Sequence, residues 1–335
     1  MPDEFKRRTL IGLLASHDHG GTNMKLVNVL NALCSTGNRG KLDNFHFLVT
    51  GGTFRRIIAG EDANKVAGIE PVNPETKDFL YPRITVLPSR VDGGVTILSY
   101  FITQQKCNIV WPFLTPLTAH WLTPENLALM RLCDQWHVKR LMNTGSVMEW
   151  FDREADLDAE RNPQPCPPRI FDSLGASDYG SGYAEFRVPP RSYPPEQIGK
   201  KTLALIAHDE MKPRMVEFAV DNEHVLARFD RILTTGTTGR EVGDAAPSLH
   251  DKITRYHSGP KGGDIEIATE VLFGRCHVVI FFIDPLHPHP HIEDIRVVFG
   301  ACMIQDHVRM LTNEMQAREW IDRVARRPQA AAPTP

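Results

Sequence analysis

The two halves of this 335-residue chain repeat the same order of sequence motifs. Four pairs of matching segments carry the repeat: 8–18 with 201–209, 45–57 with 229–242, 89–117 with 258–286, and 138–151 with 308–321. The third pair aligns without a gap over its whole length. Self-similarity in a fixed order is the signature of a repeated unit, and chance would not preserve that order. The sequence therefore predicts a tandem duplication, with two domains of one fold.

A segment rich in proline and glycine lies between the two repeats. It contains NPQPCPP, GASDYGSG and RVPPRSYPPE, and paired prolines and glycines favour turns over regular elements. We interpret 153–199 as a connector. The predicted organisation is then a first domain at 1–152, a second domain at 200–327 and a disordered tail at 328–335.

Within the second repeat, short apolar runs alternate with segments of helical period. TLALIA and HVVIFFI are typical of buried strands, whereas IEIATEVLF and IEDIRVVFGACMI have helical spacing. This alternation predicts an α/β fold in which helices cover both faces of a parallel sheet. Ligands of such sheets bind beyond the carboxyl ends of the strands, so the residues after each apolar run are candidates for a site.

Charge and hydropathy exclude several classes of function. The chain has 38 Lys plus Arg against 41 Asp plus Glu, so it lacks the basic excess of a nucleic-acid binder. No apolar run approaches the roughly 18 residues of a membrane span, and the first residues turn polar too soon for a signal peptide. We therefore expect a cytoplasmic protein with small-molecule partners. Its six cysteines lack CxxC spacing and are interpreted mostly as buried hydrophobic residues.

Two polar clusters follow the first two apolar runs of the second repeat. His208 and Asp209 come directly after TLALIA, with Lys212 close behind, and TGTTG at 235–239 follows RILT. Glycines let a backbone approach an anion, hydroxyls donate hydrogen bonds, and a following helix offers N–H groups and its positive end. These features indicate a phosphate site. The alternative is an ordinary turn in which a threonine caps the helix.

A third cluster, SGPKGGD at 258–264, places an aspartate at the start of a helical segment. From the residues alone, Asp264 has two interpretations. It is either a helix cap or, beside a phosphate cradle, a general base that removes a proton from a substrate.

The fourth cluster, at 284–294, contains three histidines within five residues. A metal site is one interpretation, but the alternating prolines favour an extended chain that separates neighbouring imidazoles, and no matching ligand pair lies nearby in the sequence. The other interpretation is an acid–base pair, His291 and Asp294, at a helix start. We favour the acid–base pair and predict no bound metal.

In their order along residues 200–325, the motifs AHDxxK, TGTTG, SGPxGGD, DPLxxxPHxxD and a late TN resemble those of methylglyoxal synthases. The resemblance implies a three-layer α/β/α fold with a five-stranded parallel sheet, and homohexameric assembly. It also implies a carbon-oxygen lyase that converts dihydroxyacetone phosphate to methylglyoxal and inorganic phosphate without metal or cofactor.

The resemblance assigns roles to individual residues. Asp264 matches the catalytic base. The other catalytic groups, acidic or polarising, match His291, Asp209, Asp284 and Asp294. The substrate-binding residues, including the phosphate cradle, match His208, Lys212, Thr235, Thr237, Thr238, Ser258 and Gly259.

The first repeat departs from this pattern at the residues that carry the chemistry. Asp18 and the TGGT loop at 50–53 remain, but Val95 stands in place of the base. Thr115 replaces the aspartate of DPL, and Leu122 stands where the late histidine is expected. We therefore expect no proton abstraction in the first domain. It is interpreted as a degenerate copy that serves as a structural partner or as a regulatory pocket.

The second repeat has a departure of its own. Gly300 occupies a place where the resembled family commonly has an arginine, whereas Arg131 occupies that place in the first repeat. We predict that the first domain supplies this substrate-binding cation, and that the assembly is a homotrimer with six domains. The alternative function is a non-catalytic sensor or regulatory module that binds a phosphorylated metabolite. The complete set of Asp264, His291 and Asp294 favours the enzyme.

Overall fold

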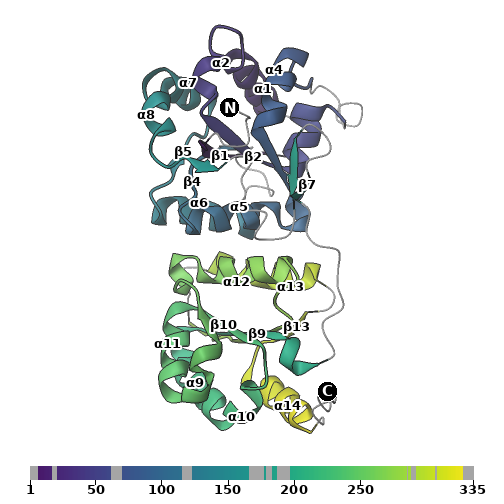
Figure 1. The fold of residues 1–335 in the computed structure, drawn as a ribbon, viewed down its shortest axis with the longest axis vertical. Helices are drawn as coiled ribbons and strands as arrows, with labels where there is room; N and C mark the ends of the chain where they lie inside the picture. Colours follow the sequence, from purple (N-terminus) through teal and green to yellow (C-terminus); the bar gives the residue numbers. More distant parts are fainter. Residues whose placement is uncertain are drawn as a thin grey trace, which may run out of the picture. The chain divides into compact units, whose positions relative to one another are not determined.

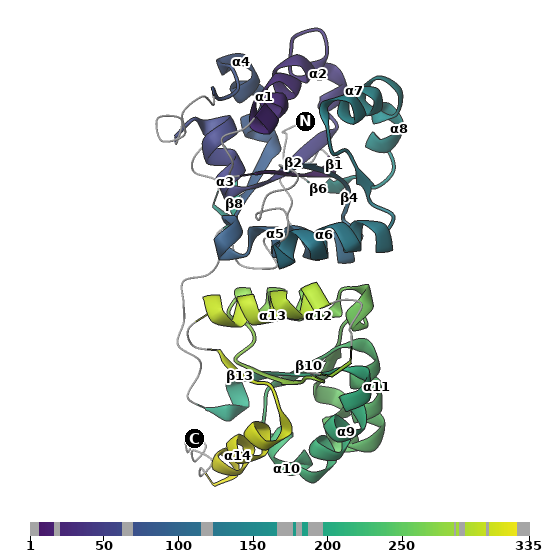
Figure 2. The same cartoon turned by 180° about the vertical axis from the view of Figure 1, so that it is seen from behind.

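The computed structural model describes residues 7–16, 21–61, 70–114, 123–165, 177–178, 183–186, 197–284, 286–287, 292–305 and 308–326. Contacts along the chain divide it into two compact units, Met1–Pro189 and Pro190–Pro335. In each unit, helices cover both faces of a central sheet (Figures 1 and 2).

The C-terminal unit contains one sheet of five parallel strands. The strands are β9 (Thr202–Ala207), β10 (Arg231–Thr234), β11 (Ile253–Arg255), β12 (Val278–Phe282) and β13 (Arg309–Leu311). They lie in the order β11-β10-β9-β12-β13, and all four pairings are parallel. The parallel five-stranded sheet predicted for this half of the chain is therefore present.

Helices form the two outer layers of the C-terminal unit. They are η6 (Ile198–Lys200), η7 (Asp209–Met211), α9 (Lys212–Asp221), α10 (Glu223–Leu226), α11 (Gly236–Ala245), η8 (Pro247–Lys252), η9 (Gly259–Lys261), α12 (Gly263–Leu272), α13 (Ile292–Ile304) and α14 (Glu314–Ala325). Helices α12 and α13 cover one face of the sheet, and α9, α11 and α14 cover the other (Figure 1).

The N-terminal unit has a larger sheet. Its strands are β1 (Arg7–Ala15), β2 (Phe45–Thr50), β3 (Ile84–Leu87), β4 (Cys107–Phe113), β5 (Lys139–Arg140), β6 (Gln164–Pro165), β7 (Ser177–Asp178) and β8 (Ala184–Phe186). The order is β5-β4-β1-β2-β3-β8-β7, with β6 paired to β1. The prediction of a five-stranded sheet in this domain is wrong, because β8, β7 and β6 extend a five-stranded parallel centre.

Helices α5 (Gly94–Thr103) and α6 (Pro124–Gln135) cover one face of this sheet, and α1 (Gly21–Leu33) and α7 (Thr144–Arg153) the other (Figure 2). The smaller helical segments are α2 (Arg39–Leu42), α3 (Gly51–Thr53), η2 (Phe54–Ala59), α4 (Pro74–Leu80), η3 (Tyr81–Arg83), η4 (Arg90–Asp92) and α8 (Ala155–Ala159).

The two units share the order of their central strands. The N-terminal centre β5-β4-β1-β2-β3 has the same sequence order as β13-β12-β9-β10-β11. The gap-free alignment of 89–117 with 258–286 also holds in space: η4 and α5 occupy the aligned positions of η9 and α12. The two halves therefore repeat one topology as well as one order of motifs.

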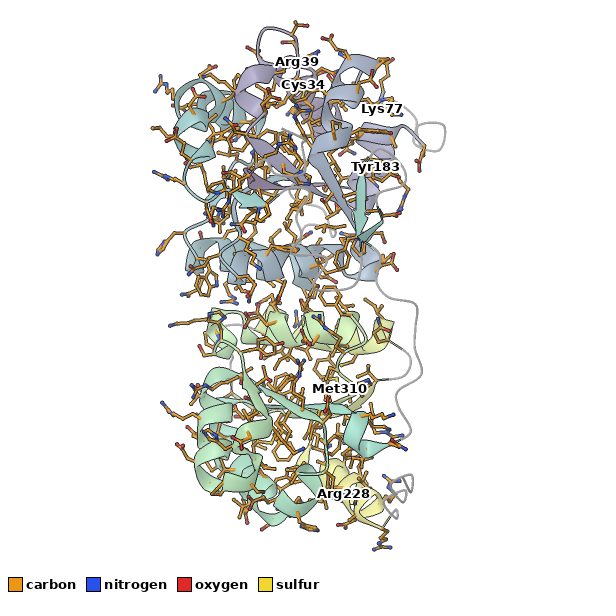
Figure 3. The ribbon with its side chains drawn as sticks, in the orientation of Figure 1. Cys34, Arg39, Lys77, Tyr183, Arg228 and Met310 are labelled. Atoms are coloured by element: carbon orange, nitrogen blue, oxygen red, sulfur yellow. The ribbon has the colours of Figure 1, made fainter. Side chains whose placement is uncertain are left out.

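The segment interpreted as a connector differs from that expectation. Its described part contributes α8 and the strands β6, β7 and β8 to the N-terminal unit. Tyr183, labelled in Figure 3, packs its ring 4.5 Å from that of Phe54 and 5.4 Å from that of Tyr81. The structured N-terminal unit therefore extends well beyond residue 152.

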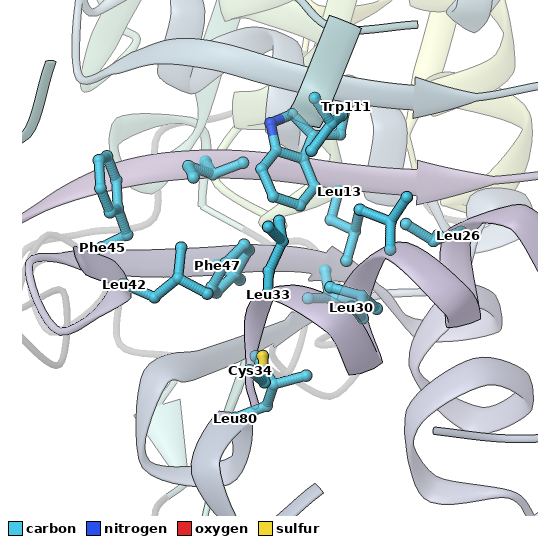
Figure 4. Packing of buried hydrophobic residues seen from close by; sticks show 14 of the residues in the cluster. Leu13, Leu26, Leu30, Leu33, Cys34, Leu42, Phe45, Phe47, Leu80 and Trp111 are labelled. Atoms are coloured by element: carbon cyan, nitrogen blue, oxygen red, sulfur yellow. The ribbon is translucent and has the colours of Figure 1, made fainter. Parts of the chain in front are cut away.

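Buried apolar side chains join the sheet of the N-terminal unit to its helices. Every residue of β2 is buried, which is typical of a parallel strand covered on both faces. Leu30 and Leu33 of α1 belong to the same cluster as Phe47 and Trp111 (Figure 4). The rings of Phe47 and Trp111 meet edge to face with centroids 5.6 Å apart. A separate cluster fills the C-terminal unit.

The described cysteines are buried hydrophobic residues, as predicted. Those with buried, free thiols are Cys34, Cys107, Cys133, Cys276 and Cys302. Burial raises the pKa of the Cys34 thiol to about 12, which makes it a poor nucleophile near neutral pH. Cys166 lies outside the described residues. In the part of the chain that the structure describes, no helix has the length and apolar character needed to cross a bilayer.

Candidate active site

A cavity of about 370 Å³ lies at the carboxyl ends of the strands in the C-terminal unit. Most of its wall consists of residues that follow strands, as the parallel sheet predicts. The site residues predicted from the sequence that line it are His208, Asp209, Lys212, Thr235, Thr237, Ser258, Gly259 and Asp264. Side chains that the sequence analysis did not select also line it, namely those of Ile206, Ala207, Glu210, Pro260, Phe281 and His287.

Asp264 lies in the first turn of α12 and is 1% exposed. The N-cap residue of this helix is Gly262, so Asp264 is not the helix cap that one interpretation of the sequence proposed. A nearly buried carboxylate on a cavity wall has the placement that a general base requires.

Two consecutive glycines position this carboxylate. Gly262 has a φ of 97°, in the left-handed region that glycine adopts without steric cost. A Cβ on Gly263 would lie 1.9 Å from the backbone oxygen of His257. Helix α12 therefore begins directly against the loop at Ser258, which puts Asp264 and that loop on one cavity wall.

The TGTTG sequence forms the start of α11. Thr235 is the N-cap residue, but its side chain makes no capping hydrogen bond, so the alternative of an ordinary threonine cap is not what the structure shows. Its hydroxyl instead bonds to that of Thr238 at 3.3 Å. Thr235 and Thr237 line the cavity, whereas Thr238 is fully buried and is not among the described residues of the wall. Thr238 therefore supports the Thr235 hydroxyl from behind.

Lys212 and Asp209 form an ion pair on the cavity wall. The side chain of Lys212 is 16% exposed and that of Asp209 is 87% exposed. The ammonium is thus held at the wall by a carboxylate on the solvent side. A phosphate group in the cavity would meet a cation already in place, and charge-assisted hydrogen bonds of this kind are among the stronger ones.

His208 is fixed in one tautomer by the backbone of a neighbouring loop. Its Nδ1 accepts a hydrogen bond from the backbone N–H of Asp284 at 2.9 Å. A neutral imidazole that accepts at Nδ1 carries its proton on Nε2. His208 is therefore held as the Nε2–H tautomer, and it lines the cavity while its Nε2 atom is buried.

Asp284 pairs with His287, and His287 lines the cavity. Its Oδ1 accepts a hydrogen bond from the backbone N–H of Leu286 at 2.9 Å, and its Oδ2 pairs with Nδ1 of His287. The Leu286 bond and the His287 pairing lower the pKa of Asp284, and the same pairing raises the pKa of His287. His287 belongs to the histidine cluster for which a metal site is one interpretation, and its spacing of three residues from Asp284 is the sequence signal that could indicate this pair.

This pair predicts a pH-dependent stability. His287 contributes stability below its usual pKa of 6.5, and this contribution is lost as the pH rises through its raised pKa. Asp284 contributes stability above its usual pKa of 3.8, which is lost as the pH falls through its lowered pKa. We expect the wild type to exceed His287→Gln in free energy of unfolding at about pH 5.5, and the excess to shrink by about pH 8.5.

Urea titrations at the two pH values measure this difference. The effect is small, because the His287 side chain is 64% exposed and solvent screens the pair. An equal difference between the two proteins at both pH values would show that the pair does not titrate as described.

The remaining predicted site residues, like Thr238 and Asp284, are not among the described residues of the cavity wall. Asp294, in the first turn of α13, is fully buried and is not among the described wall residues. His291 lies outside the described residues, as does His289, so the metal interpretation of the histidine cluster is not tested. Arg131 lies on α6, in the N-terminal unit.

The corresponding place in the N-terminal unit has a much smaller cavity. A cavity of only about 20 Å³ remains there, and Val95 lines it at the position of Asp264. The buried side chain of Arg56 lines it too and donates from Nη2 to the backbone oxygen of Ser16 at 3.0 Å. Thr115, Leu122 and Asp18 lie outside the described residues.

The fold and the cavity together define an α/β protein in which a buried carboxylate, a lysine and several hydroxyl groups share a cavity at the carboxyl edge of the sheet. No family model matches the chain. A methylglyoxal synthase from Rhizobium rhizogenes strain K84 is 46% identical over 123 residues, which are 37% of this chain and 94% of that relative. One from Brucella anthropi is 46% identical over 119 residues, which are 36% and 92% of the two chains. The chain belongs to the methylglyoxal synthase family.

A crystal structure of a methylglyoxal synthase from Elizabethkingia anophelis aligns with 42% of this chain and 97% of its own, at 25% identity and a TM-score of 0.34.

Proposed function

We propose that the C-terminal unit is a methylglyoxal synthase, a carbon-oxygen lyase that converts dihydroxyacetone phosphate to methylglyoxal and inorganic phosphate. One observation carries the proposal: the buried carboxylate of Asp264 shares a cavity of about 370 Å³ with Lys212 and the hydroxyl-bearing loops. The relatives named methylglyoxal synthase, which this chain covers over most of their length, support it. The residues themselves supply the chemistry, so the proposal includes no metal or cofactor.

The first step is removal of a proton from the hydroxymethyl carbon next to the ketone. Asp264 takes this proton and becomes a neutral acid, while the electron pair moves to the ketone oxygen to give an ene-diolate. We assign His208, which lines the cavity, to substrate binding. We assign His291 to the polarisation of the ketone oxygen, together with Asp209, Asp284 and Asp294 as the acidic groups around the substrate.

The second step is the loss of phosphate. The bond between carbon and the bridging oxygen breaks, its electron pair leaves with the phosphate, and the remaining enol becomes methylglyoxal by proton transfer. Lys212, Thr235, Thr237, Ser258 and the backbone at Gly259 are placed to stabilise the departing charge. Because these groups stabilise the charge on the departing phosphate, elimination is favoured over reprotonation of the ene-diolate. Reprotonation would make the reaction an isomerisation.

The N-terminal unit is proposed to be a duplicated copy without this activity. The shared strand order supports the duplication, and Val95 at the position of the base removes the group that would take the proton. We propose that this unit serves in the assembly, a cytoplasmic homotrimer in which six units of one fold are present. Arg131 then serves a C-terminal site that has Gly300 in place of an arginine.

Replacing Arg131 by alanine is expected to raise the KM for dihydroxyacetone phosphate by about three- to tenfold, because one charge-assisted contact to the phosphate is lost. Inhibition by inorganic phosphate should weaken in parallel. Steady-state kinetics measure both, with Arg153→Ala as a control, since that side chain is 75% exposed and pairs with Glu149. Arg131→Ala kinetics that match the wild type would exclude this role. So would a protein that light scattering shows to be a monomer and that has full activity.

The alternative function is a sensor that binds a phosphorylated metabolite without converting it, and Gly300 in place of an arginine favours it. Phosphorus NMR of the protein with dihydroxyacetone phosphate and a metal chelator separates the two. The enzyme replaces the substrate resonance by that of inorganic phosphate. A substrate resonance that broadens on binding but keeps its area would overturn the proposal in favour of the sensor.

A further inference from the structure

A larger cavity, about 700 Å³, lies in the N-terminal unit at the amino ends of its strands. Thr9 near the start of β1, Asn108 near the start of β4 and Lys139 at the start of β5 line it. This amino-end cavity is therefore at the edge of the N-terminal sheet opposite to the small Val95 cavity. Nothing in the proposed reaction uses it.

Two residues with unfavourable backbone conformations line the amino-end cavity. Gln105 has a φ of 53° and His137 a φ of 54°, and these are the non-glycine residues of positive φ in the described chain. At the position aligned with Gln105, the C-terminal unit has Gly274, with a φ of 68°. Glycine adopts this conformation without cost, and other residues do not. The N-terminal unit thus keeps a strained residue with an amide side chain where its counterpart has a glycine, and such residues gather at functional sites.

Lys106, also on the cavity wall, lacks the carboxylate partner that its counterpart has. In the C-terminal unit the aligned residue, Arg275, pairs with the buried carboxylate of Glu270 at 2.6 Å. The N-terminal unit has Phe101 at the position of Glu270. Among the described residues Lys106 forms no ion pair, and burial lowers the pKa of its ammonium group. An anionic ligand would supply the missing counter-charge.

Most of the remaining wall residues are aromatic, amide-bearing or already neutralised. Asp158 pairs with Lys139 and, at 3.3 Å, with Arg161, so these two cations are compensated within the protein. The half-buried Trp136 supplies a flat aromatic surface. Four amide side chains line the cavity besides that of Gln105, namely those of Gln104, Asn108, Asn162 and Gln164. Amide side chains can hydrogen-bond the hydroxyl groups of a ligand, and an indole can pack against its carbon–hydrogen faces. The ammonium of Lys106 can pair with a phosphate group of the ligand.

We propose that the amino-end cavity binds a phosphorylated sugar or polyol. Lys106 pairs with its phosphate, Gln105 hydrogen-bonds its hydroxyl groups, and Trp136 packs against its carbon skeleton. This site lies in a different cavity from the proposed lyase reaction, so the two proposals can be tested independently of each other.

Isothermal titration with glucose 6-phosphate, fructose 1,6-bisphosphate and glycerol 3-phosphate tests the proposal. The full chain carries Lys212→Ala in every titration, which weakens phosphate binding at the C-terminal cavity. At least one probe is expected to bind more tightly than inorganic phosphate or glucose. Lys106→Gln should weaken that binding about tenfold, whereas Lys25→Gln, on the exposed side of α1, should leave it unchanged.

Gln105→Gly separates a ligand-binding role from a structural one. Relief of the left-handed strain should raise the melting temperature by about 2 to 4 °C, while the affinity for the probe falls. The proposal is overturned if no probe binds at about 10 mM, if inorganic phosphate binds as tightly as the sugar phosphates, or if Lys106→Gln and Gln105→Gly keep the affinity of the parent protein.

Discussion

An Asp264→Asn variant is expected to lose roughly 10³-fold in kcat while it keeps the fold of the C-terminal unit. The amide has the shape of the carboxylate but cannot take up the proton from the substrate. Because the wall formed by Lys212 and the two hydroxyl loops is unchanged, the KM for dihydroxyacetone phosphate should change little. Steady-state kinetics with circular dichroism as a check of folding measure the effect.

Asp251→Asn is the matched control. Its carboxylate is fully exposed in η8, away from the cavity wall, so the same chemical change should leave kcat as it is. A rate for Asp264→Asn close to that of this control would exclude Asp264 as the base.

Gly263→Ala is expected to destabilise the C-terminal unit by about 2 kcal/mol or more and to abolish most of its activity. The new Cβ would lie 1.9 Å from the backbone oxygen of His257, and a backbone atom cannot move aside as a flexible side chain can. The start of α12 must therefore shift, and Asp264 is the next residue along the helix. Urea denaturation and steady-state kinetics follow the two effects.

Gly300→Ala provides the opposite case on a neighbouring helix. A Cβ at this position meets nothing within 4 Å, and alanine is the better helix former by about 0.5 to 1 kcal/mol. We expect this variant to be slightly more stable than the wild type and equally active. If Gly263→Ala behaves in the same way, the close packing at the start of α12 does not position the base.

The repeat made most of the fold predictable. The gap-free alignment places the glycine pair before Val95 at the same positions as the glycine pair before Asp264. The first glycine of each pair has the same backbone conformation, with a φ of 89° at Gly93 and 97° at Gly262. The strands β6, β7 and β8 could not be predicted in the same way. They occur once, in a segment whose prolines and glycines favour turns, and their pairing with the sheet is a long-range contact without local sequence pattern.

The position of the cavity could be predicted from the sequence, because the carboxyl ends of parallel strands meet at one edge of a sheet. Sequence reasoning could not distinguish the two threonines of TGTTG on the wall from Thr238, which is buried behind them. The pairing of Asp284 with His287 could be suspected from their three-residue spacing but not established, because a pairing within a proline-rich loop also depends on the path of the backbone. The strain at Gln105 is likewise a backbone property that residue type does not reveal.

The central claim is that a base and a phosphate cradle act on one substrate in one cavity. The most direct measurement incubates the wild type with dihydroxyacetone phosphate in the presence of a chelator and determines methylglyoxal and inorganic phosphate in the same samples. We predict that the two products appear together, in equal amounts, and that Asp264→Asn suppresses both. Formation of glyceraldehyde 3-phosphate without phosphate release, or no consumption of the substrate, would contradict the account.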